Sequence, residues 1–331
     1  MLFWKNSFAA KKNMMKKVSP ISTIIKMPGQ FNMIESTAMV MKKELQSKIG
    51  QITNLPTLPI IVTRVMQIVN NPSSSASDVA FVVGQDLALS AKILRLANSA
   101  FYGMPRTITS ISNAVVILGL KVINTIVLNL TVFDLFPHEK KSSLFDRTAF
   151  WRHCTSCALI CRFLTERLRK FVLFDAEEAF CAGLLHDIGK VVMEQYLHED
   201  FHKALRHAKH RKLPLYEAEK ETLGYSHTDV AQWLMSGWQL PVQLSQPLIH
   251  HHDPQHAKEC VDIVALCHYA DFLCYEFKLT IGEDYTPPPL NAASVELLEI
   301  RPDDIEDLKG RLSMELERVN IFCDIAAGQP T

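Results

Sequence analysis

A short run in the middle of the chain, Leu185-His-Asp-Ile-Gly-Lys190, places the imidazole of His186 next to the carboxylate of Asp187. On a continuous helix these two side chains would point about 100° apart. They could still serve one pair of metal ions if the carboxylate bridged both ions and the imidazole bound one of them. Such ligands suit Fe, Mn, Zn or Ni, and water held between two such ions becomes a strong hydroxide nucleophile.

A two-metal site needs further ligands, which must come from other parts of the chain. The candidates lie on separate predicted elements of the second half: His153, His227, His251, His252 and Asp271. Three cysteines follow His153 at helical spacing, and they also could bind metal: Cys154, Cys157 and Cys161. No fourth ligand with clear spacing accompanies these thiols, so we interpret them as small buried core residues.

The elements that must position the ligands are predicted to be helices. Apolar residues recur with helical periodicity, and no stretch shows convincing β-alternation. The predicted helices of the first half cover residues 60–70, 77–85, 86–98, 110–119 and 120–136. Those of the second half cover residues 144–168, 175–196, 201–211, 214–223, 227–236, 241–250, 257–277, 292–300 and 303–322. The predicted fold class is therefore all-α.

Composition narrows the class of protein further. Lys plus Arg and Asp plus Glu number 35 each, so no net charge draws the chain to nucleic acid, and no specific nucleic-acid binding is expected. The eight cysteines are interpreted as free thiols in a reducing cytoplasm. Residues 1–48 form a lysine-rich leader whose apolar runs fall short of the roughly 20 residues of a membrane span. We expect this leader to be partly disordered and the protein to be cytoplasmic, with no transmembrane segment.

In chain order, the candidate ligands resemble the metal ligands of HD-domain phosphohydrolases, and most closely those of HD-GYP phosphodiesterases. The resemblance implies that one ion is held by His153, His186, Asp187 and Asp271. It also implies that Asp187 bridges to a second ion, which is held by His227, His251 and His252. Lys190 matches the family lysine that contacts substrate phosphate, so Lys190 and Asp187 are the expected catalytic residues.

The first half of the chain resembles a particular branch of this superfamily, the HDOD domain. The motifs occur in family order: Leu55–Pro59, Gln85–Leu89, Ala97–Gly103, Ile108–Ile111 and Ala114–Gly119. The resemblance spans about residues 52–277. It implies one HDOD domain over residues 49–280, with a helical subdomain at 49–143 and an HD-like subdomain at 144–280. Residues 281–331 then form a Pro-rich linker and a helical tail, which by default packs back on its own domain, with docking onto a partner as the alternative.

Two departures from HD-GYP proteins bear on function. Asp253-Pro-Gln-His-Ala257 replaces the Gly-Tyr-Pro loop that helps to read cyclic di-GMP, and Ala149 replaces the Glu of members with three metals. Both departures argue against cyclic di-GMP hydrolysis and a third metal. Within the run of three histidines that ends at His252, we prefer the last two as ligands because Pro254 follows as in the family.

Three functional hypotheses follow. The first is a bacterial regulatory protein that relays a signal by binding a protein partner or a nucleotide, with two metal ions that mainly organise the helices. The second is a metal-dependent phosphohydrolase that acts on a nucleotide or cyclic nucleotide, and the third is a scaffold without a ligand. The complete ligand series with Lys190 supports the second, whereas the missing Gly-Tyr-Pro loop and the whole HDOD half favour the first.

Overall fold

The computed structural model describes residues 56–136, 144–168, 172–279 and 286–328, and all regular structure within these ranges is helical. This confirms the predicted all-α class. The basic leader at residues 1–48 lies outside the described residues. The N-terminal helices are α3 (Ile60–Val69), α4 (Ala76–Val83), α5 (Leu87–Ala97), α6 (Ile111–Leu118) and α7 (Leu120–Leu135).

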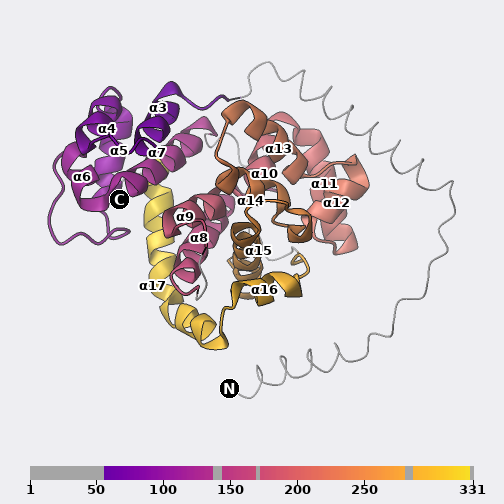
Figure 1. Ribbon diagram of the computed structural model, residues 1–331. Coiled ribbons are helices and arrows are strands. Elements are labelled where there is room, and N and C mark those ends of the chain that lie inside the picture. The colour runs from indigo at the N-terminus through magenta and orange to yellow at the C-terminus, as the bar shows by residue number, and fades with distance from the viewer. Residues whose placement is uncertain (1–55, 137–143, 169–171, 280–285, 329–331) are drawn as a thin grey trace. The chain divides into compact units, whose positions relative to one another are not determined.

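Within the described residues, the second half forms eight helices that carry, adjoin or surround the predicted ligands (Figure 1). These are α8 (Arg147–Thr165), α9 (Ala176–Leu185), α10 (Ile188–Tyr196), α11 (His198–Arg211), α12 (Leu215–Leu223), α13 (His227–Trp238), α14 (Val242–His250) and α15 (Val261–Glu276). A short 3₁₀ turn, η2 (Pro254–His256), lies between α14 and α15. The tail forms α16 (Ala292–Leu298) and α17 (Pro302–Ala326).

The predicted single helix over residues 175–196 is wrong, because the chain breaks between α9 and α10 at His186 and Asp187. Asp187 has φ −99° and ψ 11° and its side chain does not cap α10. Apolar residues continue on both sides of the break, from Leu185 to Ile188, so the sequence periodicity shows no interruption. Tertiary contacts of the His-Asp pair replace the regular helical geometry at this point.

The C-terminal helix packs on its own domain, which was the preferred prediction for the tail. α17 lies against α8 and also contacts α5 and α7 (Figure 1). The Phe322 ring near its end is buried, with its centroid 5.1 Å from that of Phe101 and 5.8 Å from that of Phe133. One continuous buried cluster includes residues from both halves of the HDOD region and from α17. The subdivision at residues 143 and 144 stays a prediction.

Two close helix crossings bring the site-bearing helices together. A Cβ atom on Gly183 would lie 2.7 Å from the Cα of Ala158, so α9 can approach α8 this closely only with glycine there. A Cβ atom on Gly189 would lie 1.9 Å from the carbonyl oxygen of His227, where α10 meets the start of α13. Both crossings lie within three residues of the His186-Asp187 pair.

No single helix within the described ranges is both long and apolar enough to cross a membrane. Helices α6 and α7 reach that length and composition only as a pair, across a bend of 120°.

We predict that Gly189→Ala lowers the free energy of unfolding by about 3 kcal/mol, the upper end of the usual cost of overpacking, because backbone atoms must move. Chemical denaturation measures this change. The matched control is Gly237→Ala in α13, where an added Cβ meets no atom of the described residues within 4 Å. The control should be neutral or stabilising by about 0.5–1 kcal/mol. Equal stability of the two variants would contradict the close crossing.

Candidate metal centre

The predicted ligands converge from five stretches of the chain. His186 and Asp187 occupy the break between α9 and α10, and His227 is the first residue of α13. His251 and His252 follow the last residue of α14 directly. The remaining two, His153 and Asp271, lie within α8 and α15. Helix ends therefore supply five of the seven side chains.

One group of side chains surrounds the Oδ2 atom of Asp187. The Nε2 atom of His186 lies 3.2 Å from this oxygen, and the Nε2 atom of His153 lies 3.6 Å from it. Asp271 closes the group, with its Oδ1 atom 3.2 Å from His153 Nε2 and 3.7 Å from His186 Nε2. The ligand atoms of His153, His186 and Asp271 all lie within 4.8 Å of one another.

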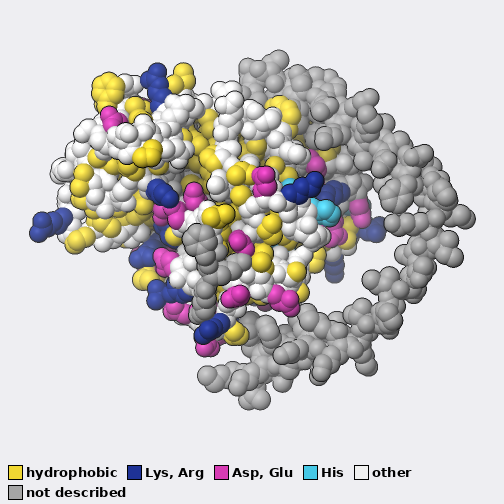
Figure 2. All heavy atoms as spheres, in the orientation of Figure 1, with side chains coloured by type: hydrophobic (Ala, Val, Ile, Leu, Met, Phe, Trp, Pro, Cys, Tyr) yellow, Lys and Arg dark blue, Asp and Glu magenta, His cyan; other side chains and the backbone are white. Residues whose placement is uncertain are grey.

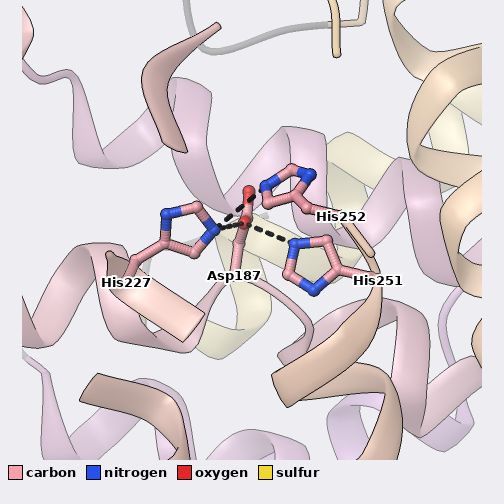
Figure 3. Close-up of side chains that lie close together, drawn as sticks. All are labelled: Asp187, His227, His251 and His252. Carbon is pink, nitrogen blue, oxygen red and sulfur yellow. Dashed lines mark hydrogen bonds and ion pairs between the residues drawn. The ribbon is translucent and has the colours of Figure 1, made fainter. Parts of the chain in front are cut away.

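A second group surrounds the other oxygen of the same carboxylate (Figure 3). The Oδ1 atom of Asp187 lies 3.2 Å from His227 Nε2 and 3.5 Å from His251 Nε2. The Nε2 atom of His252 lies 3.1 Å from that of His227. Asp187 therefore presents one oxygen to each group, which is the arrangement of a bridging carboxylate.

Hydrogen bonds on the far side of the rings fix the orientation of four histidines. The Nδ1 partners are Leu279 O for His153 (3.0 Å), Gly183 O for His186 (2.8 Å), Pro247 O for His251 (2.9 Å) and Glu219 Oε2 for His227 (2.7 Å). Because each partner is an acceptor, each Nδ1 carries the proton and donates it. In the neutral imidazole, each Nε2 then keeps a lone pair that faces the centre, as in histidines that bind metal.

Glu219 is a residue beside the centre that the sequence did not single out. It lies on α12, is fully buried, and accepts hydrogen bonds from both the backbone N–H (2.9 Å) and the Nδ1 of His227. A carboxylate in this position makes the imidazole a stronger ligand. The available signal was a glutamate on a predicted helix, eight residues before His227, but spacing alone does not show that it is buried.

Unpaired polar atoms test whether a cation fits the centre. Five buried atoms that face it lack a hydrogen-bond partner among the described residues: His153 Nε2, His186 Nε2, His251 Nε2, Asp187 Oδ1 and Asp271 Oδ1. Buried polar atoms without partners are rare and costly in folded proteins. Nitrogen and carboxylate oxygen donors converging in this way fit divalent transition-metal ions.

The charges of the centre also favour a cation. Burial alone would lower the pKa of His153 and His186, but the carboxylates beside them outweigh burial and raise both pKa values well above the ordinary value. Burial alone would raise the pKa of Asp187 and Asp271, yet the neighbouring imidazoles hold it well below the usual range. Burial lowers the pKa of His251. The carboxylates therefore attract positive charge most strongly on the side of His153.

Lys190 points into the centre. Its Nζ atom lies 2.5 Å from Asp187 Oδ2, and the residue is 2% exposed. Burial alone would lower the pKa of this amine, but the negative charge of Asp187 outweighs burial and raises it. Lys190 therefore stays charged and neutralises part of the carboxylate charge.

The remaining histidines near the centre have other partners. His268 is buried and bridges two backbone groups, with its Nδ1 2.6 Å from the carbonyl oxygen of His251 and its Nε2 accepting from Asn291 N–H at 2.9 Å. His256 is exposed and pairs with Asp253.

The three cysteines that follow His153 are all buried, which confirms that they are core residues. One ligand atom each of Cys157, His186 and Cys267 also lies within 4.8 Å of the other two.

A family model for the HDOD domain matches residues 55–254, and the chain belongs to this family. An uncharacterized protein of Treponema pallidum (strain Nichols) is 24% identical over 209 residues, which cover 63% of this chain and 40% of that protein.

Solved structures with the same fold come from several bacteria. An HDOD domain protein with unknown function from Geobacter sulfurreducens is 24% identical with a TM-score of 0.71, covering 87% of this chain and 99% of that one. A protein from Shewanella amazonensis SB2B, called a "putative phosphohydrolase", is 25% identical with a TM-score of 0.64 and coverages of 86% and 98%. A "putative signal transduction protein" from Marinobacter aquaeolei VT8 is 19% identical with a TM-score of 0.71 and coverages of 88% and 66%.

We predict that Glu219→Gln weakens metal binding on the His227 side by about 10- to 100-fold, because the variant loses the charge that polarises the imidazole. Equilibrium titration with a divalent transition metal measures this affinity. Binding on the His153 side should change little. The control is Glu221→Gln on the same helix, whose carboxylate pairs with His207. Unchanged affinity for both ions in Glu219→Gln would contradict the assigned role.

Proposed function

We propose that this chain is a regulatory HDOD protein that relays a signal by binding a protein partner or a nucleotide. We further propose that it holds two divalent transition-metal ions. His153, His186, Asp187 and Asp271 would hold one ion, and Asp187 would bridge to the second, held by His227, His251 and His252. In this proposal the ions act mainly by tying together the helices that carry their ligands.

The enclosure of the centre is the observation that carries this proposal. Asp187 is 1% exposed, and His227 and His251 are fully buried. Lys190, the residue expected to contact a substrate phosphate, instead pairs with Asp187 inside the centre. This pairing favours a centre that holds helices together over one in which Lys190 binds substrate.

A metal-dependent phosphohydrolase is the second candidate, and the completeness of the ligand set favours it. Two bound metal ions would supply an activated water and offset negative charge on a phosphoryl group. Of the seven ligands, His252 is the one that is only partly buried, and the ring of Tyr216 stacks on it with centroids 4.4 Å apart. A nucleotide would therefore approach from the side of His252.

We predict about two transition-metal ions per chain at this centre in protein purified without chelator. The double variant His186→Ala/Asp187→Ala should lose both ions, because it removes the bridging oxygens together with one imidazole. Elemental analysis of the folded protein measures the content. The control His256→Ala removes an exposed imidazole outside the centre and should leave the content unchanged. Metal content that is substoichiometric and insensitive to the double substitution would exclude both metal-based proposals.

A screen of cyclic and linear dinucleotides with the metals restored then separates relay from catalyst. The regulatory proposal predicts no hydrolysis at full metal occupancy, even where a nucleotide binds. Turnover that disappears in Asp187→Ala, while the control His256→Ala keeps it, would overturn the regulatory proposal in favour of the phosphohydrolase.

A further inference from the structure

A second cluster of metal-ligating side chains lies at the corner between α10 and α11. Glu194 lies in the last turns of α10, His198 is the first residue of α11, and His202 follows one turn later. The three residues are spaced four apart, and Leu197 between the helices does not disturb their common face. None of them belongs to the centre around Asp187.

The Glu194 carboxylate offers one oxygen to each imidazole. Its Oε2 atom lies 3.1 Å from the Nε2 atom of His202, and its Oε1 atom lies 3.3 Å from the Nδ1 atom of His198. The two imidazole centroids are 3.9 Å apart. One ligand atom from each of the three residues lies within 4.8 Å of the other two.

Burial distinguishes this cluster from an ordinary surface pair. The Glu194 side chain is 6% exposed and that of His202 is 12% exposed, whereas His198 is 50% exposed. A carboxylate removed from water needs a compensating charge or hydrogen bonds. A divalent ion held by both imidazoles would compensate the charge of this carboxylate.

We propose that Glu194, His198 and His202 bind one divalent transition-metal ion of the zinc class. Two imidazoles and a carboxylate are a usual ligand set for zinc, and solvent could supply a fourth ligand beside the exposed His198. The Nδ1 atom of His198 also lies 3.2 Å from the carbonyl oxygen of Glu194, and metal binding would replace this contact.

The ion would connect α10 to α11, and α10 leads back to the centre around Asp187. Glu194 follows Asp187 by seven residues, or roughly 10 Å along a helix, and the same helix carries Lys190. Binding at this corner would hold the C-terminal end of α10 against α11. Zinc should therefore stabilise the folded chain, since any ligand that binds only the folded state does so. This inference does not depend on the proposed function.

The test is a titration of the full chain with Zn²⁺ in a metal buffer, after the centre around Asp187 has been filled. The wild type should bind one more zinc ion per chain than the double variant His198→Ala/His202→Ala. The matched control is His207→Ala, which removes an imidazole of the same helix that pairs with Glu221 at 2.8 Å but has no third ligand among the described residues. This control should bind zinc like the wild type.

Equal zinc stoichiometry and affinity in the wild type and the double variant would overturn the proposal. If the double variant does not fold, the single variant His198→Ala replaces it, because that half-exposed side chain contributes little to packing. It should bind zinc at least about tenfold more weakly. An affinity equal to that of His207→Ala would also overturn the proposal.

Discussion

The structure of the centre depends on one carboxylate placed between two groups of imidazoles. Asp187 directs Oδ2 toward His153 and His186 and Oδ1 toward His227 and His251. Because this carboxylate is buried, its charge must be compensated within the protein. Lys190 contributes one positive charge. The same need for compensation explains why the pKa of the nearby His153 is raised despite burial.

Helices can surround one carboxylate only if their backbones approach closely, and the chain provides for this at two glycines. Gly183 lets α9 lie against α8, and Gly189 lets α10 meet the start of α13. The outward hydrogen bonds of the histidines then aim their Nε2 atoms inward, with Glu219 in this role for His227. Contacts at the centre therefore hold several helices together, which agrees with the regulatory function proposed for it.

The residues that converge at the centre, the helical fold and the HDOD family could be predicted from the sequence because their signals are local or occur in a fixed order. His186 and Asp187 are adjacent, and the series continues to Asp271 in the family order. The break between α9 and α10 could not be predicted, because apolar periodicity continues across it and tertiary contacts impose it. Glu219 was missed for a related reason: only the folded structure shows which glutamate on an amphipathic helix is buried.

Anomalous X-ray diffraction from crystals of the metal-loaded protein would show whether Asp187 bridges two metal ions. We expect two anomalous peaks, one beside each carboxylate oxygen of Asp187, with His153 and Asp271 around one peak and His227 and His251 around the other. A fully loaded crystal with no anomalous peak next to Asp187, or with all of its metal bound elsewhere, would contradict this expectation.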